Sequence, residues 1–310
     1  MILKPDEGNG VVILDRSDYD SGVLKITSDS TKFKPIKEDP TLLRESQLQR
    51  FLRKLKTNGH LDPKVYFKIY PSGSQPATIY GLPKMHKPRG PYSLPPFRPI
   101  VSSIGTYNYE LAKYLCYLLQ PYIPTNYCTQ DSFTFVNEIQ DIPLSGNFMV
   151  SFDVESLFTN IPLDECIDKV VHYVKEDKTD IKLSATDLKT LLCFATAKTH
   201  FLFKGSFYDQ VDGVSMGSPL APVLANLLVG HNEKDWIENY KGSKILFYRR
   251  YVDDTFCICE REQDAVFFYN YINSQHPNIR FSMEGEVDNK LAFLDVLVDN
   301  KPQSPDICFP

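Results

Sequence analysis

Two adjacent carboxylates, Asp253 and Asp254, stand between two apolar runs, Ile245–Tyr248 and Thr255–Ile258. Both runs are typical of β-strands, so the doublet is predicted to occupy the tight turn between them. Neighbouring side chains on extended backbone point to opposite faces, whereas a turn can aim both acids at one point. Adjacent carboxylates repel each other unless a cation lies between them. The sequence therefore predicts a hairpin whose tip becomes a site if a third acid faces it.

The candidate third acid is Asp153, at the end of the apolar run Asn147–Phe152, which is typical of a buried strand. Three acids from two strands suit two divalent cations about 3.5–4 Å apart, an arrangement that serves in-line displacement at phosphorus. Carboxylate oxygens favour Mg²⁺ over softer ions. A solvated turn or a helix cap is the alternative explanation of an Asp-Asp pair, and the partner strand argues against it.

The composition indicates an ordinary globular protein, with 42% hydrophobic and 24% charged residues in a chain of 310. Seven cysteines, an odd number without paired spacing, favour reduced thiols over a disulfide framework. The six histidines form no zinc pattern. No apolar run has the length of a membrane span, and the start of the chain lacks a secretory signal, so we expect an intracellular protein without a membrane partner.

The charge is distributed unevenly around a net value of −5. Residues 44–98 carry 11 Lys and Arg against 2 acids, a net +9, whereas residues 151–310 carry 16 against 25, a net −9. A basic first half attracts phosphates and an acidic second half attracts metal ions. The alternative for the basic residues near 50 is a solvated helix face.

Apolar residues at helical spacing predict helices, and Gly and Pro residues mark the turns that end helices and strands. Short strands broken by prolines are expected from Val65 to Ile104, and a hairpin is expected around the turn Lys204-Gly205. A helix is expected to start at Gly217-Ser218-Pro219, and one strand is expected from Leu291 to Val298. The other expected elements are helices near 39–59, 110–119, 162–174, 187–196 and 263–274, and a strand at 279–283.

Several segments, in this order and spacing, resemble the fingers and palm motifs of reverse transcriptases, and their wording is most similar to the Penelope-like retroelement family. The resemblance runs from about residue 10 to the end of the chain. The segments that carry it are Tyr80–Lys87, Pro96–Ser102, Ser151–Pro162, Gly213–Pro222, Tyr251–Asp254 and Leu291–Val296. The last of these resembles the hairpin that follows the third palm motif.

This resemblance implies an α+β fold with the fingers and palm of a right-hand polymerase. Its palm would be an antiparallel sheet backed by helices, and no thumb is expected within these residues. The expected division is an N-terminal segment at 1–30, a fingers-like region at 31–145 and a palm at 146–310.

The resemblance also implies the chemistry, which is RNA-directed DNA synthesis in a retrotransposon. Asp153, Asp253 and Asp254 would be the catalytic residues and, with the carbonyl of Val154, would hold two Mg²⁺ ions, or Mn²⁺ in their place. The partners would be an RNA template, a DNA primer and deoxynucleoside triphosphates, and the family suggests a nuclear location. The oligomeric state is left open.

Further residues would contact the nucleotide. Phe158 would pack under the sugar and exclude a 2′-hydroxyl, although core packing is its alternative explanation. Met216 and Gly217 would lie near the base pair, with Met216 replacing the Gln that many retroviral-type enzymes carry, and a helix cap is the alternative. Lys84 and Arg98 would grip the triphosphate, because a transferring phosphoryl group needs positive charge. Lys87 is a substitute for Lys84.

Two other residues have positional arguments only. Lys290 would protonate the leaving pyrophosphate, and Asp295, taken as a charge within an apolar strand, is given a structural role. Two alternatives to the polymerase remain at this stage. One is a non-catalytic, nucleic-acid-binding remnant of a retroelement, and the other is a two-metal nuclease of another fold.

Overall fold

The computed structural model describes residues 1–85, 94–176, 181–300 and 306–308. The chain forms two compact units, each from two stretches: residues 1–121 with 162–223, and residues 122–161 with 224–310. These units interleave along the chain, whereas the sequence suggested contiguous ranges, and the names fingers and palm stay proposals. None of the described helices combines the length and apolarity needed to cross a membrane.

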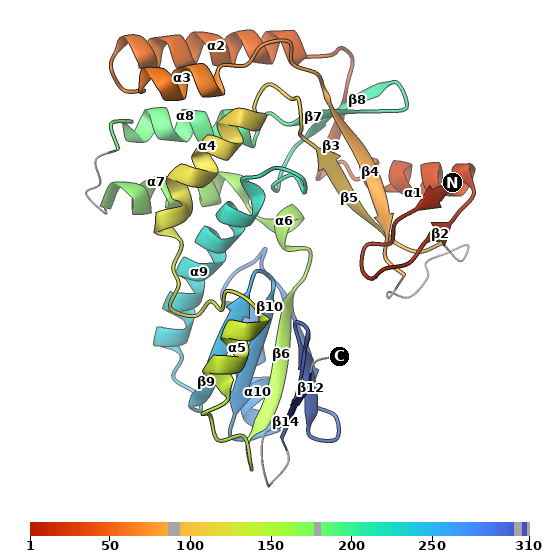
Figure 1. Cartoon of the computed structure of the whole chain (residues 1–310), viewed down its shortest axis with the longest axis vertical. Helices are drawn as coiled ribbons and strands as arrows, with labels where there is room; N and C mark the ends of the chain where they lie inside the picture. The colour runs from red at the N-terminus through yellow and green to blue at the C-terminus, as the bar shows by residue number, and fades with distance from the viewer. Residues whose placement is uncertain (86–93, 177–180, 301–305, 309–310) are drawn as a thin grey trace. The chain divides into compact units, whose positions relative to one another are not determined.

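The first unit is built on a five-stranded sheet in the order β3-β8-β7-β4-β5 (Figure 1). β4 and β7 are parallel and the other neighbours are antiparallel, so the sheet is mixed. A separate two-stranded sheet, β1-β2, precedes it. The strands are β1 (Ile2–Leu3), β2 (Val12–Ile13), β3 (Phe33–Ile36), β4 (Ala77–Pro83), β5 (Phe97–Ser102), β7 (His200–Phe203) and β8 (Ser206–Gln210).

Helices surround this sheet, and α2 shows why they form. Its apolar positions Leu48, Leu52 and Leu55 recur at helical spacing and are fully buried, while Arg50, Arg53 and Lys54 are exposed. Gly59 ends the helix with φ of 73°. The helices of this unit are α1 (Arg16–Thr27), α2 (Thr41–Thr57), α3 (Pro63–Ile69), α4 (Tyr109–Leu119), α7 (Leu163–Glu176) and α8 (Ala185–Ala195), and α4 continues into a 3₁₀ turn at Gln120–Tyr122.

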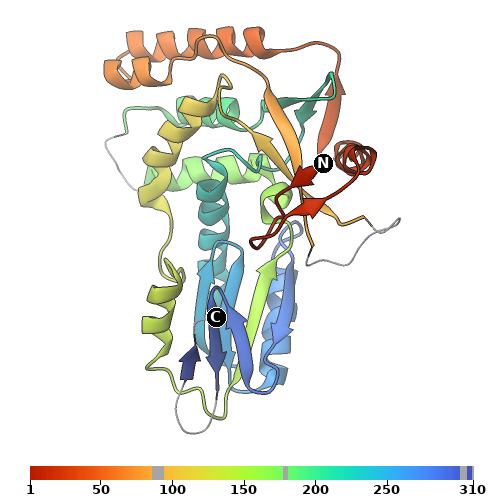
Figure 2. The same cartoon turned by 45° about the vertical axis from the view of Figure 1, so that its right-hand side comes forward.

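The second unit is built on a four-stranded, fully antiparallel sheet in the order β11-β6-β10-β9. A three-stranded sheet, β12-β13-β14, lies against it (Figure 2). The expected antiparallel sheet backed by helices is confirmed. The elements are α5 (Ser132–Ile139), β6 (Phe148–Val154), α6 (Leu157–Asn160), α9 (Ala221–Asn239, in this unit from Leu224), β9 (Ile245–Tyr251), β10 (Asp254–Cys259), α10 (Glu262–Ser274), β11 (Phe281–Gly285), β12 (Lys290–Phe293), β13 (Val296–Asp299) and β14 (Asp306–Cys308).

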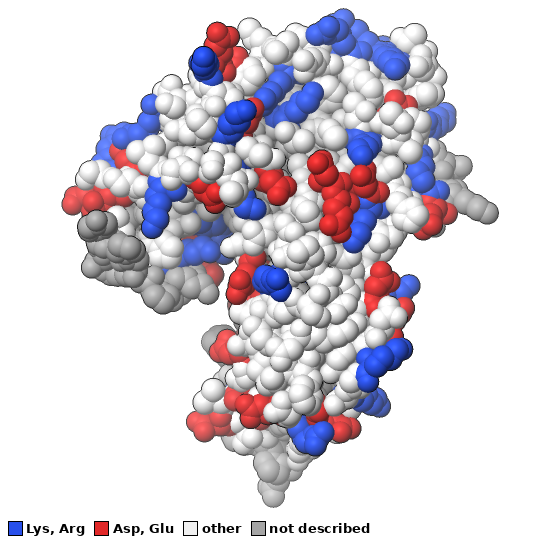
Figure 3. Space-filling view, turned by 180° about the vertical axis from the view of Figure 1, so that it is seen from behind, with Lys and Arg blue, Asp and Glu red and all other residues white. Residues whose placement is uncertain are grey.

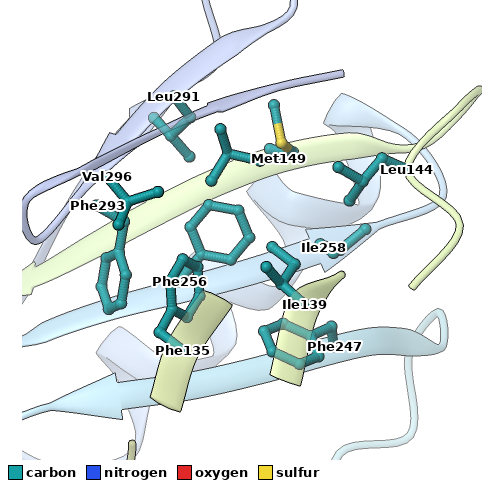
Figure 4. Packing of buried hydrophobic residues seen from close by; sticks show 11 residues of the cluster. Phe135, Ile139, Leu144, Met149, Phe247, Phe256, Ile258, Leu291, Phe293 and Val296 are labelled. Atoms are coloured by element: carbon teal, nitrogen blue, oxygen red, sulfur yellow. The ribbon is translucent and has the colours of Figure 1, made fainter. Parts of the chain in front are cut away.

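The two faces of this sheet pack differently. On one face, Phe256 of β10 meets Phe135 of α5 and Phe293 of β12, at ring-centroid distances of 5.1 and 5.5 Å (Figure 4). On the opposite face, Phe152 of β6 contacts Phe268 of α10, at 5.9 Å. Because both faces are covered, the strands are held rigidly, and side chains at their ends have fixed positions.

Several sequence expectations were wrong in detail. A helix, α3, lies where broken strands were expected, because Asp62 caps it and Pro63 occupies its first position. α9 begins at Ala221 rather than at Gly217-Ser218-Pro219, which form turns. The strand expected from Leu291 to Val298 is divided by a turn into the β12–β13 hairpin, as the resemblance of Leu291–Val296 to a hairpin implied. The sequence reasoning also missed α1 and α5.

Candidate active site

Asp153 and Asp254 lie directly opposite each other on neighbouring strands. β6 and β10 are antiparallel, and their register pairs Asp254 with Asp153. Residues in such a pair project to the same face and have Cβ atoms about 4.5–5.5 Å apart. Two carboxylates that are distant in sequence are thus neighbours, on the face that carries Met149 and Phe256 further along the strands.

The third acid, Asp253, belongs to the turn between β9 and β10. Tyr251 pairs with Asp254, which leaves Val252 and Asp253 as a two-residue loop. The carbonyl oxygen of Asp253 accepts a hydrogen bond from the Val154 amide, at 3.0 Å. The hairpin tip is therefore tied by its backbone to the strand that carries Asp153.

The backbone of this turn is strained. Val252 has φ of 55°, a value that a β-branched residue rarely adopts. A conformation of this kind costs about 1–3 kcal/mol and persists only where surrounding contacts hold it. The turn therefore needs support from its neighbours.

The donor set at the hairpin tip suits a hard divalent cation. Asp254 is exposed, and Asp153 and Asp253 are half-buried, so solvent reaches all three residues. Carboxylate oxygens are the ligands that Mg²⁺ prefers. Within the described residues, however, no group of three or more His, Cys, Asp or Glu side chains stands close enough together to hold a metal ion. The three carboxylates would have to turn toward one another to share an ion.

A buried arginine supports the turn from below. The side chain of Arg250 is fully buried, and its Nε donates to both carboxylate oxygens of Glu233, at 3.1 Å each. Its Nη1 donates to Asn226 Oδ1 and to the Val252 carbonyl, both at 2.8 Å. Its Nη2 lies 3.2 Å from Cys128 Sγ. One guanidinium thus joins the α9 core to the backbone of the strained turn.

Glu233 completes this buried cluster from α9. It accepts a hydrogen bond from the Tyr248 hydroxyl at 2.6 Å in addition to those from Arg250. Burial raises the pKa of the Glu233 carboxyl, and Arg250 and Tyr248 oppose that rise. Burial also raises the pKa of Tyr248 well above its usual value. Sequence reasoning missed this cluster. The available signal was an arginine next to Tyr251, at a position that strand alternation directs to the same face as Tyr248.

Phe158 lies in the short helix α6, which follows β6 directly. It is half-buried and is not part of the aromatic core around Phe135 and Phe256. Ser156, with φ of 50°, turns the chain from the strand into α6. The short segment from Asp153 to Phe158 keeps the aromatic ring near the end of β6.

Met216 and Gly217 are in the first unit, where they attach to β5. The Met216 carbonyl accepts from the Val101 amide and the Gly217 carbonyl accepts from Ser103 Oγ, both at 2.7 Å. Gly217 has φ of 118°, and a Cβ at this position would lie 2.3 Å from the Val101 carbonyl oxygen. The glycine is therefore required by its close approach to β5, a structural reason that the sequence did not reveal.

Of the residues expected at the triphosphate, Arg98 is already engaged. It lies on β5, and its Nε is 2.7 Å from Asp6 Oδ1. Asp6, which sequence reasoning missed, is anchored in turn by its amide on the Pro83 carbonyl, at 3.0 Å. Lys84 follows β4 directly and donates its amide to Pro96. Lys87, the substitute for Lys84, lies outside the described residues.

Lys290 and Asp295 belong to the β12–β13 hairpin. Lys290 Nζ is 3.7 Å from Asp299 Oδ2 on the facing strand. Asp295 is exposed in a two-residue turn after Leu294, whose φ is 55°. The description of Asp295 as a charge inside an apolar strand was therefore wrong, because the turn exposes it to water.

Solved structures with similar folds include two telomerases and a viral RNA polymerase. The apo telomerase of Candida tropicalis matches with a TM-score of 0.67 and 10% identity, over 100% of this chain and 55% of that one. The telomerase of Candida albicans, in complex with a TWJ fragment of telomeric RNA, matches with a TM-score of 0.61 and 12% identity, over 96% and 52%. The RNA-dependent RNA polymerase of BmCPV matches with a TM-score of 0.50 and 14% identity, over 92% and 26%. At these identities the similarity shows the fold alone.

This chain spans about half the length of the telomerase chains that it matches. No curated protein sequence matches it. A comparison with protein families matches residues 96–283 to the family described as "Reverse transcriptase (RNA-dependent DNA polymerase)". That match includes β5, all three acids and the segment around Gly217. Since it extends over more than half of the chain, the protein belongs to the reverse transcriptase family.

Proposed function

We propose that this chain is an RNA-directed DNA polymerase of a Penelope-like retrotransposon, which extends a DNA primer on an RNA template. The observation that carries the proposal is the register of β6 and β10, which sets Asp153 opposite Asp254 beside the turn that holds Asp253. A solvated Asp-Asp turn needs no third carboxylate on the neighbouring strand. Membership of the reverse transcriptase family supports the same assignment.

In the proposed reaction the primer 3′-oxygen bonds to the α-phosphorus of a deoxynucleoside triphosphate. The 3′-hydroxyl loses its proton to solvent water, and the bond from the α-phosphorus to the pyrophosphate oxygen breaks, with pyrophosphate leaving. Asp153, Asp253 and Asp254, with the Val154 carbonyl, would hold two Mg²⁺ ions, which when bound would activate the attacking oxygen and stabilise the leaving one. The three carboxylates supply the negative charge that such ions require.

The nucleotide would be recognised by the remaining residues. The Phe158 ring would pack against the sugar and select deoxynucleotides, and Lys84 and Arg98 would neutralise the triphosphate. Arg98 would exchange its Asp6 partner for a phosphate oxygen, because both are anionic acceptors of the same donor groups. Met216 and Gly217 would lie near the base pair, and Lys290 would have to leave Asp299 to donate a proton.

The template would bind to the outer face of α2 and α3. This face carries exposed basic residues on both helices, including Arg50, Arg53, Lys54 and Lys68, and Asp62 is the one acid within residues 46–98. Basic side chains gather over these helices in Figure 3. Exposed Phe67, with Lys56 Nζ 4.5 Å from its ring centroid, adds a surface on which a base can stack. Basic and aromatic groups together favour a nucleic acid over a solvated helix face.

The test is primer extension on poly(rA)·oligo(dT), with Asp253→Asn as the variant. We expect extension by the original chain and none by the variant, because a neutral amide cannot supply a carboxylate's charge. Asp295→Asn is a matched control, because Asp295 has the same place in its turn as Asp253. Each is the second residue of a two-residue turn whose first residue, Leu294 or Val252, has φ of 55°. That control should extend normally.

Two results would contradict the proposal. Full activity of Asp253→Asn would remove the acid from the chemistry. RNA binding by the original chain without Mg²⁺- or Mn²⁺-dependent extension would favour a nucleic-acid-binding remnant instead. Circular dichroism of each variant separates loss of chemistry from loss of fold.

A further inference from the structure

We infer that Arg250 is a positioning residue that fixes the geometry of the Asp253 turn through the Val252 carbonyl. The inference rests on the proposed function for its catalytic consequence, but its structural content stands by itself. The side chain of Arg250 points toward α9, where it contacts Glu233 and Asn226. It would act on the acidic turn through one atom, the carbonyl oxygen of Val252.

The contacts of Arg250 fix the orientation of its guanidinium in addition to neutralising its charge. Nε is fixed by Glu233, Nη2 by Cys128, and Nη1 by Asn226, so the plane of the guanidinium is set from three sides. The remaining contact, 2.8 Å from Nη1 to the Val252 carbonyl, is then a hydrogen bond of fixed direction. A guanidinium presents five N–H groups in a rigid fork, which no other side chain offers.

The turn is the element that requires such a hold. Val252 has φ of 55°, and a strained residue relaxes unless its neighbours prevent it. Relaxation of Val252 would rotate the peptide that joins it to Asp253. Because Asp253 contacts β6 through its backbone carbonyl, this rotation would move its carboxylate relative to Asp153.

The backbone of Arg250 is fixed as well. Its amide donates to the Tyr127 carbonyl at 2.7 Å, and its carbonyl accepts from the Thr129 amide at 3.0 Å. The segment at Tyr127–Thr129 therefore covers the outer edge of β9, which ends the four-stranded sheet. Arg250 is thus immobile at both ends, and the turn beyond it is held to a rigid support.

A role in stability alone explains this cluster less well. Buried ion pairs are often no more stabilising than apolar side chains of the same volume, because removing two charges from water offsets their attraction. Arg250 lies two residues before Val252 and donates one N–H group to the Val252 carbonyl, and a positioning role explains this arrangement. The two roles differ in what a conservative substitution changes.

The experiment compares Arg250→Lys with Arg44→Lys in the full chain. Lysine keeps the charge but has one nitrogen, so it cannot reach Glu233, Val252 and Cys128 together. Arg44 is the matched control, because it forms a bidentate pair with Asp209, at 2.7 and 2.9 Å, in the first unit. Both variants should lose a similar amount of thermal stability.

Four readouts separate positioning from stability. We expect Arg250→Lys to speed amide hydrogen exchange in the hairpin at residues 247–256, and Arg44→Lys to leave it unchanged. We expect Arg250→Lys to raise the half-saturating Mg²⁺ concentration and lower kcat, each by about 10- to 100-fold, the range for groups that orient metal ligands. The KM for the nucleotide should stay within about twofold, because Arg250 orients the acids and not the triphosphate.

Unchanged hairpin exchange and unchanged Mg²⁺ dependence in Arg250→Lys would overturn the inference. If that variant does not fold, Glu233→Gln gives a second test, since it weakens the anchor that sets the direction of the guanidinium and thereby loosens the hydrogen bond to the Val252 carbonyl. Hairpin exchange equal to that of the original chain in this variant would equally overturn it. An original chain that fails to extend primers would refute the proposed function, while hydrogen exchange would still decide the positioning role.

Discussion

Gly217→Ala tests whether Gly217 serves the fold or the substrate. A Cβ at this position would lie 2.3 Å from the Val101 carbonyl oxygen, a separation that real Cβ atoms essentially never show. The obstructing atom belongs to the backbone of β5, so it cannot rotate away. Either β5 or the segment around Gly217 must shift, and both hydrogen bonds between them are then weakened.

The magnitude follows from these contacts. Alanine at φ of 118° costs about 1–3 kcal/mol in backbone strain. The hydrogen bonds from the Val101 amide and from Ser103 Oγ, both 2.7 Å long, contribute about 1 kcal/mol each. We therefore expect Gly217→Ala to lower the free energy of unfolding by about 3–5 kcal/mol.

Gly105→Ala is the control. Gly105 also has a positive φ, of 81°, but a Cβ at this position would meet no other atom within 4 Å, so the substitution should cost only about 1–2 kcal/mol. Urea denaturation followed by circular dichroism measures both variants, and amide exchange at Val101 reports the bond to Met216 directly. Equal losses of stability in the two variants would refute the argument. A stable Gly217→Ala protein without polymerase activity would instead favour a direct role beside the base pair.

Three further predictions concern other parts of the chain. The double variant Lys54→Gln with Lys68→Gln should weaken RNA binding and reduce the slope of log affinity against log salt by about 1.4, at roughly 0.7 for each phosphate that is no longer neutralised. The control, Lys241→Gln with Lys244→Gln, replaces two lysines that are also exposed and should leave the affinity and the slope unchanged. Equal effects of the two double variants in salt titrations would argue against the α2–α3 surface. Arg98→Ala should raise the KM for nucleotides about 10-fold or more in steady-state extension, since hydrogen bonds to charged groups contribute about 1.5–3 kcal/mol, and an unchanged KM would assign Arg98 to the Asp6 pair alone. Burial, and to a lesser degree the positive charge of Arg44, lowers the pKa of His200 below 6.5, so the folded state favours the neutral ring. The contribution of neutral His200 to stability is complete above about pH 6.5 and is lost as the pH falls. His200→Gln should flatten this part of the curve of stability against pH, and an unaltered curve in urea titrations would contradict the assignment.

Local sequence signals were sufficient where one residue type forces one conformation. The β7–β8 hairpin was predicted around its turn, because Gly205 readily adopts the positive φ that a type I′ turn requires. Apolar periodicity predicted the helix α2, whose Leu48, Leu52 and Leu55 are fully buried. Each of these features depends on neighbours in the chain.

The sequence failed where a tertiary contact overrides propensity. The turn at Leu294 carries a positive φ on a residue that disfavours it. The apolar pattern therefore indicated a strand there, and only the resemblance implied a hairpin. The helix α3 is only seven residues long, and its apolar positions are too few to give a period.

For the candidate site, local pattern alone pointed to the three acids and to the strands beside them, because apolar runs flank each acid. The fold adds what no local pattern contains: Asp153 stands opposite Asp254, Arg250 donates to the carbonyl before Asp253, and Gly217 approaches the backbone of β5. Propensity and patterning act over a few residues, whereas strand register, buried ion pairs and backbone contacts join residues that the chain separates.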